Sequence, residues 1–216
     1  PWGGLEEVGP GVWALISTPL QDRTTLCNGG IVAGSAGVVL VEAVASPAGA
    51  QWLASQARRL TGRWPDGVVL THHHGDHTGG LAGLGDGDGF PDVLATAVIR
   101  DRVLDADRGA EASGTAVDPA RGELLAGARI MPMEGTMPLD LGDRVVHMHA
   151  RDGHTPSDIT VELDGPPVVF CGDLVWNRMV PNFVDAIPSR LGRAVRALRR
   201  DDTSTIYVPG HGPLAD

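Results

Sequence analysis

Residues 71–80 read Thr-His-His-His-Gly-Asp-His-Thr-Gly-Gly, and four of the eight histidines of the chain lie within them. The pattern is His72-x-His74-x-Asp76-His77, which brings three imidazoles and one carboxylate into a short segment. Zinc, iron and manganese accept ligands of these two kinds. We predict that this segment is a metal-binding loop rather than an ordinary polar loop, and that His73, in the gap position, points away from the metal.

Strand-like runs surround the histidine segment. Short stretches of branched apolar residues between turn signals predict strands over 12–16, 30–33, 38–41, 68–70, 128–133, 144–150, 159–163, 168–171 and 205–208. Helices are predicted from Ser46-Pro47 to Trp64, where Pro65 ends the helix, and over 97–105 and 189–200. Residues 106–128 are predicted to be a polar, mobile segment. Strands followed by a helix occur twice, which predicts two similar halves stacked in one α/β domain.

Three more candidate ligands come after predicted strands. His154, Asp173 and His211 each follow a glycine just beyond the end of a strand. Any one of them is compatible with an ordinary turn, but because all three share this position we predict that they complete the site.

The Gly/Asp-rich stretch 83–92 is not predicted to bind a metal ion. An EF-hand calcium loop that begins at Asp86 requires Glu at its twelfth position, where this chain has Ala97.

The amino-acid composition limits the classes of partner that the chain is expected to bind. The chain has 17 arginines, no lysine and 27 acidic residues, and its formal net charge is −10. Such a surface argues against nucleic acid and anionic lipid as partners, and no apolar run reaches the roughly 20 residues that cross a bilayer. We therefore expect a soluble protein with a small-molecule substrate. The chain begins at Pro1 without an initiator methionine, so a preceding segment is expected and the compartment stays unassigned.

With these motifs the sequence resembles the metallo-β-lactamase-fold hydrolase superfamily over nearly the whole chain. The resembling motifs are His72-x-His74-x-Asp76-His77, Gly153-His154-Thr155-Pro156, Cys171-Gly172-Asp173 and Pro209-Gly210-His211-Gly212. The resemblance implies that residues 1–216 form a single α/β domain, a four-layer αβ/βα sandwich with the metals at one edge between the sheets. Only five residues follow His211, so a covering C-terminal helix that family members commonly have is expected to be missing.

The resemblance also implies a ligand set. It assigns His72, His74 and His154 to a first metal, Asp76, His77 and His211 to a second, and Asp173 to a bridging position. The Gly-Asp context of Asp173 favours glyoxalase II-type dinuclear hydrolases over true β-lactamases. Glu42 stands where much of the family has an aspartate, and we expect it to support the ligands, as we expect of Thr155 and Asp158.

The implied activity is hydrolysis of an ester, thioester, lactone or amide carbonyl of a small molecule. Two divalent ions, with zinc favoured and iron or manganese as alternatives, would activate a bridging hydroxide as the nucleophile. Asp76 is assigned a catalytic role as well, orienting this hydroxide or moving its proton. The alternatives are β-lactamase activity, a non-haem iron oxidoreductase that resembles persulfide dioxygenases, and a non-catalytic binding domain. Formation of a homo-oligomer is left open.

Other polar and aromatic residues are assigned outside the ligand set. His147 and His149 alternate along one predicted strand and are expected to form a polar face. Cys171 is expected to be a buried structural thiol. The candidates for the wall of the substrate pocket, with loop packing as the alternative, are Trp176, Asn177, Arg178 and Phe183.

Overall fold

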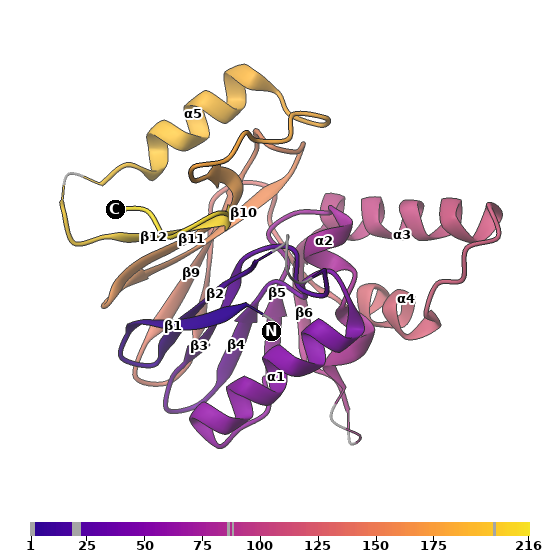
Figure 1. The fold of residues 1–216 in the computed structure, drawn as a ribbon, viewed down its shortest axis with the longest axis horizontal. Coiled ribbons are helices and arrows are strands. Elements are labelled where there is room, and N and C mark those ends of the chain that lie inside the picture. The colour runs from indigo at the N-terminus through magenta and orange to yellow at the C-terminus, as the bar shows by residue number, and fades with distance from the viewer. Residues whose placement is uncertain (1–2, 19–22, 86, 88, 201) are drawn as a thin grey trace.

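Two β-sheets pack face to face between helical layers in the computed structural model, which describes residues 3–18, 23–85, 87, 89–200 and 202–216. Helices α1 (Pro47–Thr61), α3 (Ala97–Ala112) and α4 (Pro119–Ala126) cover the first sheet, and α5 (Pro188–Leu198) covers the second (Figure 1). This arrangement is the four-layer αβ/βα sandwich expected from the sequence. Asp86 of the rejected calcium loop lies outside the described residues.

The first sheet has seven strands in the order of the chain. They are β1 (Gly4–Gly9), β2 (Val12–Ile16), β3 (Gly29–Ala33), β4 (Val38–Val41), β5 (Gly67–Val69), β6 (Asp92–Thr96) and β7 (Arg129–Met131). The first four strands form an antiparallel meander, whereas β4 to β7 are parallel. Parallel neighbours need crossover connections, and these include α1, between β4 and β5, and α3 and α4, between β6 and β7.

The second sheet has five strands in the order β12-β11-β10-β9-β8. They are β8 (Thr136–Asp140), β9 (Val145–Arg151), β10 (Asp158–Asp164), β11 (Pro167–Trp176) and β12 (Ile206–His211). Strands β8 to β11 are antiparallel, and β12 runs parallel to β11 after the α5 crossover. The carboxyl ends of β5, β9 and β12 all lead to donor residues of the predicted site.

Helix α1 begins as predicted and ends earlier. The Ser46 hydroxyl accepts a hydrogen bond from the Gly49 amide at 3.2 Å, and Pro47 occupies the first helical turn. The predicted end at Trp64 is wrong, because Gly62 adopts a left-handed conformation with φ 78° and donates its amide to the carbonyl of Arg58. A glycine at this position closes a helix more readily than any residue with a Cβ.

The prediction of a mobile segment over 106–128 is also wrong. Helix α3 continues to Ala112, and α4 begins behind an Asp118 cap with Pro119 in its first turn. Only Ile99 and Val103 of α3 are buried, so its apolar stripe is too thin to reveal its length. Strands β1, β6 and β8 were not predicted either. Strand β8 contains Pro138 and lies at the edge of its sheet, where a missing amide donor is tolerated.

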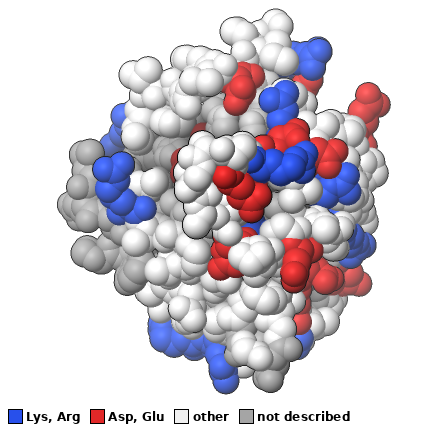
Figure 2. Space-filling view, turned by 90° about the vertical axis from the view of Figure 1, so that its right-hand side faces the viewer, with Lys and Arg blue, Asp and Glu red and all other residues white. Residues whose placement is uncertain are grey.

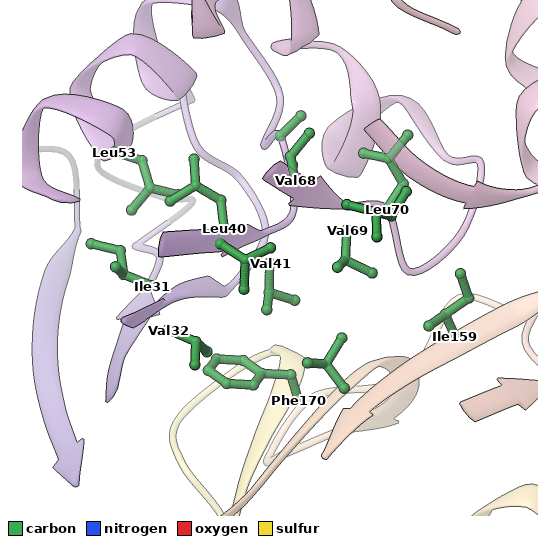
Figure 3. Close-up of a cluster of buried hydrophobic side chains, with 14 of the residues drawn as sticks. Ile31, Val32, Leu40, Val41, Leu53, Val68, Val69, Leu70, Ile159 and Phe170 are labelled. Atoms are coloured by element: carbon green, nitrogen blue, oxygen red, sulfur yellow. The ribbon is translucent and has the colours of Figure 1, made fainter. Parts of the chain in front are cut away.

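The main core lies between the two sheets. Phe170 of β11 reaches toward Val32 and Val41 of the first sheet, and Leu53 of α1 packs on the other side of that sheet (Figure 3). The ring of Phe170 approaches the backbone so closely that a Cβ on Gly30 would lie 2.3 Å from its Cε1. A second cluster beneath α5 contains Cys171 with Leu174, Ala194 and Leu198, which agrees with a structural role for this thiol.

Charges of both signs are mixed on the surface. Figure 2 shows acidic and basic side chains interleaved on the face that carries α3 and α4, where Arg100 pairs with Asp101 and Arg108 with Asp105. Among the described helices, no segment is both long and apolar enough to cross a membrane.

Candidate metal centre

The seven predicted donors come together at one edge of the sandwich. The histidine segment follows β5, and its second half forms the short helix α2 (Gly75–Thr78), which carries Asp76 and His77. His154 lies between β9 and β10, and His211 ends β12. Asp173 was expected in a loop, but it lies within β11, beside a register shift at Gly172.

The first donor group consists of His72, His74, His154 and Asp173. His74 Nδ1 lies 3.1 Å from the Nε2 atoms of both His72 and His154. Asp173 Oδ2 lies 3.3 Å from His154 Nε2 and 3.8 Å from His72 Nε2. Three imidazole nitrogens and one carboxylate oxygen therefore converge on a single point.

The second donor group consists of Asp76, His77 and His211. His211 Nε2 lies 3.3 Å from Asp76 Oδ2, and His77 Nε2 lies 3.6 Å from the same oxygen. The other oxygen of Asp173, Oδ1, lies 3.1 Å from His77 Nε2 and 3.4 Å from His211 Nε2. Asp173 thus presents one oxygen to each group.

These distances fit divalent metal ions. Tetrahedral ligands about 2.0–2.1 Å from zinc are separated from one another by roughly 3.3–3.4 Å. The Nε2 atoms of His77 and His211 and Oδ1 of Asp173 are buried and have no hydrogen-bond partner among the described residues. Buried polar atoms are rarely left without a partner, so three such atoms directed at each other favour a ligand between them.

The electrostatics of the group also suit cations. Burial raises the pKa of Asp173, but the neighbouring histidines His77, His211 and His72 together outweigh this effect and hold the pKa well below the usual range. Burial lowers the pKa of His154 to about 4. The site therefore combines an ionised carboxylate with a neutral imidazole, and both forms are able to bind a metal.

Glu42 supports the second donor group, as predicted. It is buried at the end of β4 and adopts φ 74°. Its Oε1 lies 2.9 Å from His77 Nδ1 and also accepts a hydrogen bond from the Thr71 hydroxyl. The Thr71 hydroxyl in turn lies 3.0 Å from His72 Nδ1. One carboxylate therefore orients a histidine of each group, directly for His77 and through Thr71 for His72.

Asp158 and Thr155 act on the backbone of the His154 loop. Asp158 accepts hydrogen bonds from the amides of His154 and Thr155, at 3.0 and 3.1 Å, and from the Thr155 hydroxyl at 2.8 Å. Neither residue bonds the ring of His154, whose Nδ1 is buried and has no partner in the part of the chain that the structure describes. They therefore fix the conformation of the loop and do not determine which ring nitrogen of His154 carries the proton.

Sequence reasoning missed Asp185, which lies between β11 and α5. Asp185 Oδ2 lies 2.9 Å from His74 Nε2, on the side of the ring opposite the donor group. The same oxygen lies 3.5 Å from His73 Nε2, so His73 turns toward Asp185 and away from the seven donors. A carboxylate on the second nitrogen of a ligating histidine fixes its orientation.

The structure places the remaining candidates in different surroundings. The centroids of the Trp176 and His211 rings are 4.1 Å apart, so Trp176 packs against a residue of the second donor group. Asn177 instead packs the loop, since its side chain donates to the carbonyls of Pro213 and Leu214. His149 bonds Thr136 and faces Glu162, while His147 faces Asp164. As predicted, these two histidines form a polar face outside the donor groups.

Known proteins resemble this chain in sequence and in fold. A family model of the metallo-beta-lactamase superfamily matches residues 23–211. The chain belongs to this superfamily. A hydroxyacylglutathione hydrolase from Acidiphilium cryptum is 30% identical over 73% of the chain and 55% of its own length. One from Parasynechococcus marenigrum is 28% identical over 83% of the chain and 63% of its own length, and one from Shewanella loihica is matched over 47% of its length. The chain spans about half the length of these curated relatives.

Solved metallo-beta-lactamases share the fold. The enzyme from Pontibacter korlensis superposes with a TM-score of 0.73 at 19% identity and covers 99% of this chain and 93% of its own. FIM-1 from Pseudomonas aeruginosa, in its mono-zinc form, gives a TM-score of 0.72 at 23% identity, covering 100% and 91%. Identities this low show the common sandwich and nothing about the substrate.

Proposed function

We propose that this protein is a dinuclear metal-dependent hydrolase that cleaves an ester, thioester, lactone or amide bond of a small molecule. The observation that carries the proposal is Asp173, whose two oxygens face two separate groups of donors. A carboxylate in this position suits two neighbouring cations. The superfamily membership and the similarity to hydroxyacylglutathione hydrolases support hydrolysis, and among these bonds they favour a thioester.

Seven residues would hold the metal ions. His72, His74 and His154 would bind the first ion, Asp76, His77 and His211 the second, and Asp173 both. When bound, two divalent ions, which we take to be zinc, would acidify a water molecule and polarise the substrate carbonyl. Nitrogen-rich groups of this kind suit zinc better than magnesium or calcium.

The residues themselves contribute orientation and proton handling. Glu42, Thr71 and Asp185 hold the rings of His77, His72 and His74. Asp76 is the most exposed of the three carboxylates around His77, with 30% of its side chain accessible. Its Oδ2 faces His77 and His211, and its other oxygen would orient the attacking water and accept its proton.

A substrate panel tests this proposal. Purified protein loaded with zinc is assayed with a nitrophenyl ester, a hydroxyacyl thioester of glutathione, a lactone and nitrocefin, with and without a chelator. We expect hydrolysis of at least one carbonyl substrate that is lost on chelation and restored by zinc. His154→Ala should abolish it, whereas His147→Ala, which changes a histidine outside the donor groups, should retain it. Hydrolysis that persists in the metal-free protein contradicts the proposal.

A further inference from the structure

The segment between β11 and α5 crosses the rim of the metal centre. At its beginning, the Asn177 amide donates to the carbonyl of His211 at 3.0 Å. At its end, the Ile187 amide donates to the carbonyl of Gly153, next to His154, at 2.9 Å. Between these points Asp185 contacts His74. The segment 177–187, which we call the rim loop, is therefore bonded to the second donor group at one end and to the first at the other.

The rim loop exposes apolar side chains. Residues 179–184 read Met-Val-Pro-Asn-Phe-Val and carry no charge. Val180 is 85% exposed and Val184 is 83% exposed, and Met179 and Phe183 are also exposed. A single exposed apolar residue needs no explanation, but four within six residues, at the edge of a site made of charged and polar groups, indicate a binding surface.

The rim loop is held in shape by its own hydrogen bonds. The Val184 amide donates to Asn182 Oδ1 at 3.0 Å, and the Ala186 amide donates to the carbonyl of Phe183 at 3.1 Å. A surface with a fixed shape loses less conformational entropy when a ligand binds to it.

We infer that the rim loop binds an apolar substituent of the substrate, an alkyl or aryl group close to the scissile carbonyl. This inference rests on the proposed function, because the tethers of the loop to His211, Gly153 and His74 set its distance from the reacting bond. The uncharged stretch 179–184 offers nothing that would pair with a charged substituent, whereas an alkyl chain lying on it would cover the exposed valines. The substrate class is therefore an ester or thioester with an apolar group on its acyl or leaving-group side.

A binding measurement tests the inference without turnover. Acetohydroxamate and octanohydroxamate are titrated calorimetrically into protein loaded with zinc. Each buried methylene contributes measurably to affinity, so we expect the octanoyl compound to bind at least about tenfold more tightly. Val180→Ser with Val184→Ser should remove most of that difference. Val145→Ser, which changes an exposed valine at the far end of β9, should leave it intact.

Kinetics then identify the side of the bond that carries the apolar group. Nitrophenyl esters with acyl chains of increasing length vary one side, and acetate esters of increasingly long alcohols vary the other. We expect kcat/KM to rise with chain length in one series and the double serine variant to flatten that rise. Equal affinities for the two hydroxamates, or a preference that the double variant retains, overturn the inference even if hydrolysis depends on metal. A chain-length preference in binding that the double variant removes, without metal-dependent hydrolysis, overturns the proposed function and retains the rim loop only as a surface that binds apolar groups.

Discussion

Glu42 Oε1 lies 2.9 Å from His77 Nδ1, and both side chains are fully buried. The same carboxylate accepts a hydrogen bond from the Thr71 hydroxyl, which neighbours His72. A histidine bonded in this way presents its other nitrogen in a fixed direction. The relationship links the end of β4 to the histidine segment after β5, two neighbouring parallel strands.

Replacing Glu42 should weaken the second metal position. Glu42→Gln removes the charge next to His77 while keeping the shape of the side chain, and a change of this kind typically costs about 10- to 100-fold in metal affinity. Competition with a chromogenic chelator measures the metal affinity of the variant and of the unaltered protein. Glu162→Gln is the matched control, because Glu162 is a largely buried glutamate that pairs with Arg151 outside the donor groups. An equal loss of affinity in both variants would refute the orienting role of Glu42.

Arg121 of α4 connects the outer helices to the histidine segment. Its guanidinium lies 3.2 Å from Asp107 of α3 and donates to the Thr78 hydroxyl of α2 at 3.0 Å. Because Arg121 and Asp107 are both largely buried, Arg121→Met leaves a carboxylate without its partner and should lower the free energy of unfolding by about 2 kcal/mol. Urea denaturation measures this change.

The exposed Arg108–Asp105 pair provides the comparison for Arg121. Exposed ion pairs contribute little, so Arg108→Met should change the stability by less than about 0.5 kcal/mol. If the Arg121 variant is no less stable than the Arg108 variant, the link between α4 and α2 does not contribute to the stability of the protein.

Gly210 leaves room for the carboxylate of Asp173. A Cβ at this position would lie 1.9 Å from Asp173 Oδ1, so Gly210→Ala should displace Asp173 and reduce the bound metal to less than about half. Elemental analysis after dialysis gives the metal content. Gly122→Ala on α4, where a Cβ meets no atom within 4 Å, should bind metal normally and be slightly more stable, by up to about 1 kcal/mol. Normal metal content in the Gly210 variant would contradict the assigned position of Asp173.

The donor residues could be predicted because the spacing within the histidine segment is local, and because His154 and His211 follow strands that end at the same edge. The supporting role of Glu42 could be predicted from the resemblance to the superfamily, in which an aspartate commonly stands at this place. Asp185 could not be predicted. It contacts His74 across 111 residues of sequence, from a loop without periodic pattern. Only the three-dimensional path of the rim loop brings the two together.

Some elements of the fold could likewise be predicted from the sequence, and others could not. The meander β2 to β4 and the start of α1 follow from apolar runs and a Ser-Pro cap. Helices α3 and α4 bury few apolar side chains, so hydrophobic periodicity does not reveal their length. The Asp118-Pro119 cap was the available signal for α4, and reading it would have placed a helix in the second half of the predicted mobile segment.

The metal content of the purified protein tests the central claim most directly. Protein dialysed against zinc and then against metal-free buffer should retain two zinc ions per chain. Asp173→Asn, which weakens the oxygen donors shared by both groups, should retain fewer than two and lose hydrolysis, while Asp164→Asn, on an exposed strand end, should match the unaltered protein. Far fewer than two ions per chain, with hydrolysis fully retained, would contradict the account.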